Sequence, residues 1–86
     1  MIIPLGSTEQ HGRHCPVCTD SIATELPCQI AAEMANVPYY ELIPFGYSPQ
    51  HLHPPGIASG TVTLSAATYQ NVLYEVGRSL LHNGFN

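Results

Sequence analysis

The chain has 86 residues, of which 44% are hydrophobic and only 9% charged, and its net charge is −4 with two basic residues. Nucleic-acid binding is excluded because it requires clustered Lys and Arg, and the absence of a long apolar run or a basic-flanked signal segment predicts a cytoplasmic protein without a membrane partner. An ordinary soluble domain has roughly 25% charged residues, so we expect part of this surface to be buried against further chain or a partner subunit.

Three elements are predicted in the first half of the chain. Met1–Leu5 is a short apolar run ended by glycine, which predicts a buried strand. After a polar loop, Asp20 is expected to cap a helix that runs to about Asn36, with Pro27 either kinking that helix or delaying its start. Tyr39–Ile43 is β-rich and flanked by prolines, which predicts a second strand.

The second half begins with Phe45–Gly60, a segment too rich in proline and glycine for regular structure. Thr61–Leu64 is a possible short strand, and Ser65 is expected to cap a helix to about Asn83, with Gly84 as its stop. The order strand, helix, strand, loop, helix predicts an α/β fold with a mostly parallel sheet, as part of a three-layer arrangement. We expect residues 1–86 to be the amino-terminal part of one domain, truncated after the second helix.

The polar loop carries the candidate functional residues Glu9, His11 and Asp20. Glu9 and His11 are two residues apart, so an extended backbone places both side chains on one face. Asp20 at a helix start is favoured as an ionised carboxylate by the backbone N–H groups and the helix dipole. Imidazole and carboxylate ligands suit Zn²⁺ or Mn²⁺, and a carboxylate can bridge two ions. His14 is either a partner of one of these ligands or a surface histidine.

The same loop resembles the signature of the creatininase family, which reads approximately P-x-G-S-x-E-Q-H-G-P-H-L-P-x-x-T-D. The matching residues are Pro4-Leu-Gly-Ser-Thr-Glu-Gln-His-Gly12, followed by His14, Pro16, Thr19 and Asp20. The later string Phe45-Gly-Tyr-Ser-Pro-Gln-His51 is similar to a second family loop, Y-G-x-S-x-E-H, and the final helix resembles the one that precedes the family's N-G-H-G-G-N strand end.

This resemblance implies a metal-dependent amidohydrolase that hydrolyses a linear or cyclic amide through a metal-activated water. It implies that Glu9, His11 and Asp20 are metal ligands, with Asp20 bridging two divalent ions in the complete site. Ser48 and His51 match the loop beside a small-molecule amide substrate, and the full-length family implies a homo-oligomer. The remaining ligands of the family lie beyond this chain, so we expect the chain alone to be inactive, and no residue is assigned as the catalytic group.

Departures from the family pattern concern the surroundings of the ligands. Arg13 replaces a usual proline, Cys15 a leucine, and Gln50 a frequent glutamate, which leaves the shape of the substrate pocket and the substrate itself open. Two alternatives also stay open. One is a structural zinc or dithiol module built on Cys15 and Cys18, and the other is a non-catalytic, truncated fragment.

Overall fold

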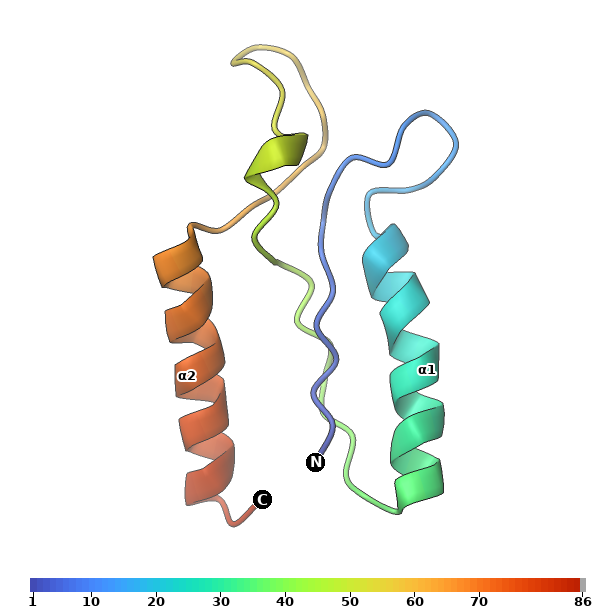
Figure 1. Cartoon of the computed structure of the whole chain (residues 1–86), viewed down its shortest axis with the longest axis vertical. Coiled ribbons are helices and arrows are strands. Elements are labelled where there is room, and N and C mark those ends of the chain that lie inside the picture. The colour runs from blue at the N-terminus through green and yellow to red at the C-terminus, as the bar shows by residue number, and fades with distance from the viewer. Residues whose placement is uncertain (86) are drawn as a thin grey trace.

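The computed structural model describes residues 1–85, which form two long helices on opposite sides of a pair of extended segments (Figure 1). α1 spans Thr19–Ala35, the short 3-10 helix η1 spans Pro49–His51, and α2 spans Ala66–His82. The domain prediction also includes Asn86, which lies outside the described residues. Neither long helix combines the length and the apolar character that a bilayer-crossing span needs.

α1 begins one residue before Asp20, so the prediction that Asp20 caps this helix is wrong. The N-cap position is held by Cys18, whose side chain makes no capping hydrogen bond. A turn sets this start, because the Thr19 hydroxyl and backbone N–H both donate to the Pro16 carbonyl, at 2.6 and 3.1 Å. Asp20 therefore lies in the first turn of the helix, where the dipole still favours its negative charge. Pro27 is accommodated inside α1 without delaying its start.

α2 matches the prediction for the second helix. The hydroxyl of the N-cap residue Ser65 accepts a hydrogen bond from the backbone N–H of Thr68 at 3.2 Å. At the other end, Gly84 adopts a φ of 85°, a left-handed conformation that glycine reaches without steric cost. The capping residues of this helix were therefore read correctly from the sequence, because each acts on its near neighbours.

The two segments predicted as parallel strands run side by side, but they form only isolated parallel bridges, Ile2 with Tyr39 and Leu5 with Ile43. Between these bridges the second segment uses one residue more than the first, so the register shifts. Pro4 lies in this interval and has no N–H to donate, although its carbonyl accepts from Ile43 at 3.0 Å. A regular ladder is therefore interrupted where the sequence alone indicated a continuous strand.

The third predicted strand, Thr61–Leu64, also contributes only bridges. Val62 pairs antiparallel with Thr8, whereas Thr63 pairs parallel with Gly46. Within residues 1–85 there is no strand of regular length. The predicted partial three-layer fold with a mostly parallel sheet is thus not confirmed, and the observed structure has two helices and little strand.

The molecule is a thin plate with Cα extents of 45 × 28 × 13 Å. Its Cα radius of gyration is 14.8 Å, whereas a compact domain of this length has about 12 Å. A thickness of 13 Å leaves little room for a side chain to be covered from both sides. The buried residues of the described chain are accordingly Pro4, Gly6, Ala32, Gly46 and Ser48.

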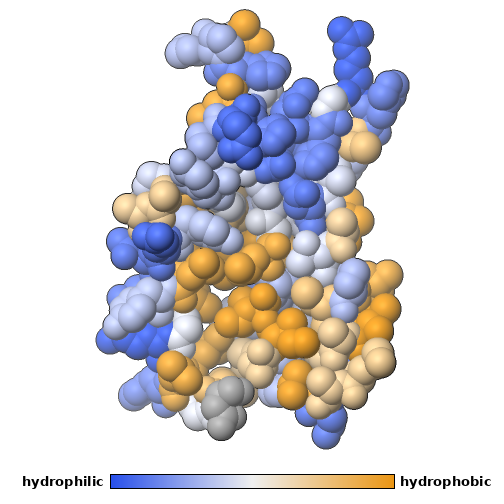
Figure 2. Space-filling view, viewed as in Figure 1, coloured by the Kyte–Doolittle hydropathy of each residue, from blue (hydrophilic) through white to orange (hydrophobic). Residues whose placement is uncertain are grey.

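Many large apolar side chains remain exposed as a result. Figure 2 shows apolar residues gathered over the lower half of one face and polar residues over the loops at the upper end. On α1 an exposed stripe repeats every four residues, and its members are Ile22, Leu26, Ile30 and Met34. This exposure agrees with the low charge content and with the expected burial of surface against further protein.

Candidate metal centre

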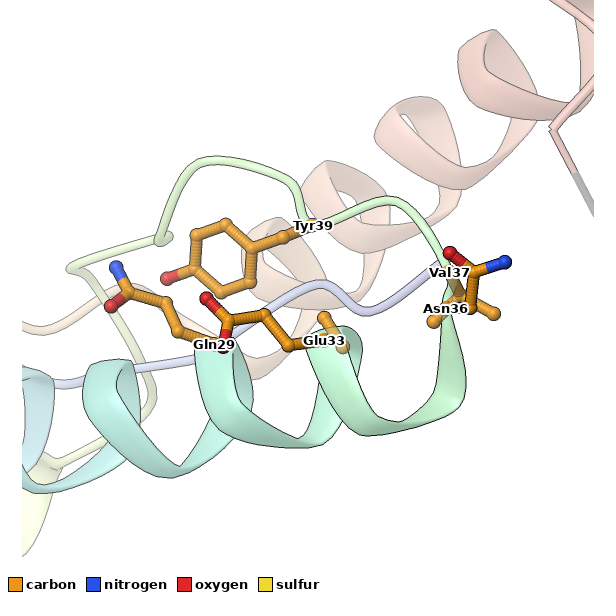
Figure 3. A pocket seen from close by; sticks show the side chains of 6 residues that line it. Gln29, Glu33, Asn36, Val37 and Tyr39 are labelled. Carbon is orange, nitrogen blue, oxygen red and sulfur yellow. The ribbon is translucent and has the colours of Figure 1, made fainter.

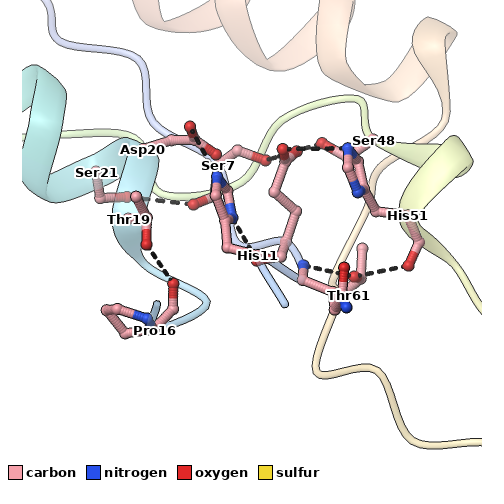
Figure 4. Close-up of polar contacts among 11 residues, drawn as sticks. Ser7, His11, Pro16, Thr19, Asp20, Ser21, Ser48, His51 and Thr61 are labelled. Carbon is pink, nitrogen blue, oxygen red and sulfur yellow. Dashed lines mark hydrogen bonds and ion pairs between the residues drawn. The ribbon is translucent and has the colours of Figure 1, made fainter. Parts of the chain in front are cut away.

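The candidate site lies where the first extended segment passes into the loop before α1. This loop carries Glu9 and His11, and the first turn of α1 brings Asp20 opposite them (Figure 4). The close approach depends on Gly6, because a Cβ there would lie 2.4 Å from the Ser21 Oγ and 3.0 Å from the Ser21 Cα. The absent side chain at Gly6 therefore allows the start of α1 to approach the ligand loop.

His11 is oriented by its own loop. Its Nδ1 lies 3.1 Å from the backbone carbonyl oxygen of Glu9, and its Nε2 lies 3.5 Å from Oδ1 of Asp20. A carbonyl oxygen can only accept, so Nδ1 carries the proton of this hydrogen bond. In the neutral ring, Nε2 then presents a lone pair to the Asp20 carboxylate. Two acceptors that face each other require a cation, either a proton or a metal ion, between them.

Asp20 has one carboxylate oxygen without a partner. Oδ1 faces His11, whereas Oδ2 is buried and makes no hydrogen bond with the described residues. A buried carboxylate oxygen without a donor is costly unless a cation or an ordered water compensates it. This oxygen is therefore free to accept a hydrogen bond or to coordinate a cation.

Glu9 is held by hydroxyl groups from two loops. Ser7 donates to Oε2 of Glu9 at 2.9 Å, and the Ser7 and Ser48 hydroxyl oxygens lie 2.8 Å apart. Hydrogen bonding from Ser48 is the main cause that holds the pKa of Glu9 below its usual value, with Ser7, His51 and His11 adding to it and burial opposing it. Glu9 therefore presents an ionised carboxylate, which is the form that binds metal ions.

His51 approaches Glu9 from the second loop, which is the segment Phe45–Gly60 between the second extended segment and Thr61. Its Nε2 lies 3.4 Å from Oε1 of Glu9, and its ring is stacked on that of His11 with the ring centroids 6.4 Å apart. Thr61 connects the two loops, since its hydroxyl accepts from the Gln10 N–H and donates to the His51 carbonyl, both at 3.0 Å. One threonine side chain thus fixes the spacing of the two histidine-bearing loops.

The three predicted ligands meet. Glu9, His11 and Asp20 each offer one ligand atom, and these atoms all lie within 4.8 Å of one another. Three protein ligands of one Zn²⁺ ion, with bonds of about 2.0–2.2 Å, lie about 3.3–3.8 Å from one another. The three side chains must therefore close by up to about 1 Å for all of them to contact one ion. Among residues 1–85 this is the only such group, and the donor set suits Zn²⁺ or Mn²⁺.

An open pocket of about 430 Å³ lies against this group. Its walls include the candidate ligands Glu9 and Asp20, the two serines Ser7 and Ser48, and Tyr69 from α2. A second hollow, of about 350 Å³, lies at the other end of α1 (Figure 3), but a single carboxylate lines it and it holds no group of metal-binding side chains. Its walls are formed by Gln29, Ala32, Glu33, Asn36, Val37 and Tyr39.

Ser48 and His51, which were predicted beside the substrate, lie next to Glu9, whereas His14, Cys15 and Cys18 lie apart from the group. His14 is exposed, and its ring has neither a hydrogen bond nor an ion pair within residues 1–85. Cys15 and Cys18 are exposed free thiols, and neither belongs to a metal-binding group in the described chain. The zinc module built on these cysteines therefore lacks a third ligand.

Sequence reasoning missed Ser7 and Thr61, which support the ligand-bearing loop, and Tyr69, which lines the pocket beside it. Ser7 lies inside the Gly-Ser-Thr-Glu string, so its proximity to Glu9 was a usable signal. Thr61 and Tyr69 are separated from the ligands by more than forty residues, and no local pattern marks them.

The creatinine amidohydrolase (creatininase) family matches the chain over residues 1–86. The chain belongs to the creatininase family. The resemblance deduced from the loop is thereby confirmed, and creatininase membership covers the whole chain rather than the motif alone.

Among the curated relatives of this creatininase chain are mycofactocin precursor peptide peptidases. The chain is 38% identical over 88 residues to the one from Mycobacterium ulcerans, 33% over 89 residues to the one from Mycobacterium tuberculosis, and 32% over 85 residues to the one from Mycolicibacterium smegmatis. Each match covers 92% of this chain but only 33–34% of the relative, so the chain spans about a third of their length. No solved structure gives a significant match.

Proposed function

We propose that a creatininase domain built on this chain hydrolyses an amide bond with a divalent metal ion held by Glu9, His11 and Asp20. The observation that carries the proposal is the convergence of these three ligand atoms within 4.8 Å, beside a buried carboxylate oxygen of Asp20 that makes no hydrogen bond within residues 1–85. Zn²⁺ and Mn²⁺ are the ions that suit this set. A bound ion of this kind lowers the pKa of a water ligand and polarises an amide carbonyl.

Asp20 is the residue that we propose bridges two ions in the complete site. Its two oxygens face different surroundings, since Oδ1 is directed to His11 and Oδ2 makes no hydrogen bond within residues 1–85. Glu9 and His11 each bring one ligand atom within 4.8 Å of a ligand atom of Asp20, so in the complete site each can contribute to a different ion. The three residues of this chain supply only part of two coordination spheres, and we therefore expect the isolated chain to be inactive or nearly so.

The chain's own residues position the substrate in this proposal. The pocket of about 430 Å³ opens over Glu9 and Asp20, and its Tyr69 wall offers an aromatic surface with a polar tip. His51, whose side chain is 35% exposed, reaches the site from the loop that the family resemblance places beside the substrate. We assign no part to His14, because its exposed ring has no contact with the ligands.

A peptide amide is the substrate class that we propose. The relatives named as peptide peptidases support a linear peptide over a cyclic small molecule. A test with a formyl amide, creatinine and a short peptide, applied to a complete domain that contains this chain, distinguishes these classes.

Metal binding by this chain is the direct test of the proposal. After removal of metal with EDTA, Mn²⁺ is titrated and the free ion is measured by electron paramagnetic resonance. We expect saturable binding of one ion, and a loss of at least about 10-fold in affinity for His11→Ala and for Asp20→Asn. The matched control is His14→Ala, which removes an exposed histidine of the same loop and should bind as the parent does. Equal binding by the parent and His11→Ala would refute the proposal.

A further inference from the structure

Two hydroxyl groups are enclosed between the ligand loop and the second loop. The Ser7 and Ser48 oxygens are 2.8 Å apart, and Ser7 also lies 2.9 Å from Oε2 of Glu9. Ser48 is only 3% exposed, and it is the one polar or charged residue of the described chain that is classed as buried. Figure 4 shows these contacts as one line of dashed bonds that joins the two loops. A polar side chain buried to this degree needs a partner, and its partners here lie at a metal ligand.

The backbone of Ser48 is fixed independently of its hydroxyl group. Its N–H donates to the Thr63 Oγ1 at 2.7 Å, and its carbonyl accepts from the His51 N–H at 3.1 Å. Ser48 occupies the N-cap position of η1, where a serine hydroxyl ordinarily bonds to the helix backbone. No such capping bond is present here. The hydroxyl is instead directed out of the helix, toward Ser7 and Glu9.

The proton count of this cluster limits what the two serines can do. Each hydroxyl has one proton to donate, whereas an ionised carboxylate only accepts. Either both serines donate to Glu9, or Ser48 donates to Ser7 and Ser7 donates to Glu9. In both arrangements every hydroxyl proton is used on the path to the carboxylate, so no proton remains for a substrate.

The backbone around the pair is shaped to keep the two hydroxyls in contact. A Cβ at Gly46 would lie 3.3 Å from the Gly6 carbonyl oxygen and 3.5 Å from the Ser7 Oγ. Glycine at position 46 therefore lets the second loop pass directly beside Ser7. Gly6 and Gly46 are both buried, so this crossing belongs to the small interior of the molecule.

We propose that Ser7 and Ser48 act as one positioning unit, which fixes the Glu9 carboxylate in its ligand orientation before an ion arrives. This inference rests on the proposed function in one respect, namely that Glu9 is a metal ligand. It assigns Ser48 to the support of a ligand instead of to the substrate, and it makes Ser7 a positioning residue. Because the two hydroxyls share one set of bonds, removal of either breaks the same unit.

The first experiment needs no metal. Side-chain rotamers of Glu9 are measured in the EDTA-treated chain from three-bond couplings in nuclear magnetic resonance spectra. We expect a single rotamer in the parent and averaged couplings in Ser7→Ala and in Ser48→Ala. Ser7→Thr keeps the hydroxyl group and should restore the single rotamer. Unchanged Glu9 couplings in both alanine variants would overturn the proposal.

The second experiment measures the dissociation constant for Mn²⁺ in the same variants. We expect each alanine variant to bind about 10–100-fold more weakly, and the double variant to bind little more weakly than either single one. Ser79→Ala removes a serine hydroxyl from exposed α2 and serves as the matched control, with parental affinity expected. Independent, fully additive losses would contradict a single unit.

The two readouts separate this inference from the proposed function. If the parent binds no Mn²⁺ but Glu9 loses its rotamer in the alanine variants, the positioning unit stands and the metal proposal fails. If the parent binds Mn²⁺ and neither alanine variant changes Glu9 or the affinity, the metal proposal stands and the positioning unit fails. Circular dichroism of each variant confirms that the helices are retained.

Discussion

Gly6→Ala is expected to destabilise the chain and loosen the candidate site together. The new Cβ would lie 2.4 Å from the Ser21 Oγ, 3.0 Å from its Cα and 3.1 Å from its Cβ. Rotation of the Ser21 side chain relieves only the first of these contacts, so α1 or the ligand loop must move. Overpacking of this kind costs about 1–3 kcal/mol, which corresponds to a fall in Tm of about 4–8 °C for each kcal/mol in a domain of this size.

Gly77→Ala is the matched control for this variant, because it makes the same chemical change in the interior of α2 without a contact. A Cβ at Gly77 meets nothing within 4 Å, and alanine in a helix is more favourable than glycine by about 0.5–1 kcal/mol. Urea unfolding followed by circular dichroism should therefore shift in opposite directions for the two variants. A neighbour of the displaced Ser21 is Asp20, so Gly6→Ala should also weaken Mn²⁺ binding, whereas Gly77→Ala should not. Equal stability and metal affinity in the parent and Gly6→Ala would refute the close-approach argument.

Four further results are expected from other contacts. Thr61→Val keeps the shape of the side chain but leaves the Gln10 N–H and the His51 carbonyl without a partner. The free energy of unfolding measured in urea titrations should therefore fall by about 1–3 kcal/mol, whereas Thr61→Ser, which keeps the hydroxyl group, should stay near the parent. The lowered pKa of Glu9 stabilises the fold above the unfolded pKa of about 4.3, and this stabilisation is lost as the pH falls through the lower folded pKa. Urea titrations without metal should therefore show a shallower loss of stability below about pH 4.3 in Glu9→Gln than in the parent. Ser65→Ala removes the N-cap of α2 and should cost about 1 kcal/mol by the same measurement. Met34→Glu, at a side chain that is 84% exposed, should change the free energy of unfolding by less than about 0.5 kcal/mol while reducing self-association in sedimentation velocity.

The helices were predictable because their limits are set by near neighbours. Ser65 and Gly84 act on residues within one turn, and the structure places both as the sequence indicated. The start of α1 was predicted wrongly because Asp20 was chosen for its residue type, aspartate being a favourable N-cap. In the structure the turn at Pro16–Thr19 starts the helix earlier, and the capping preference of single residue types does not reveal this turn.

The strands were harder to predict because a strand is defined by its partner. Met1–Leu5 and Tyr39–Ile43 each have the composition of a strand. Whether they form a ladder depends on register, and one extra residue between the two bridges shifts it where Pro4 has no N–H to donate. This shift is a relation between two segments, so neither segment displays it alone.

The candidate site divides in the same way. Glu9 and His11 are coupled by a spacing of two residues and, with Asp20, by the family signature, and the structure brings all three together. Their supports are not local, because Ser48 and Thr61 reach the ligand loop from segments that are distant in the sequence. The candidate ligands could therefore be predicted from the sequence of one loop. The hydrogen bonds that hold this loop in place could be found only from the structure.

The interior of this thin molecule and the support of its candidate metal ligands are largely one set of contacts. Of the buried residues, Gly6, Gly46 and Ser48 lie at the crossing of the two loops, directly behind Glu9. The other buried residues of the described chain are Pro4 and Ala32. The rest of the plate exposes its apolar side chains on the helices and the extended segments. This distribution supports our expectation that the broad apolar faces are buried against further protein.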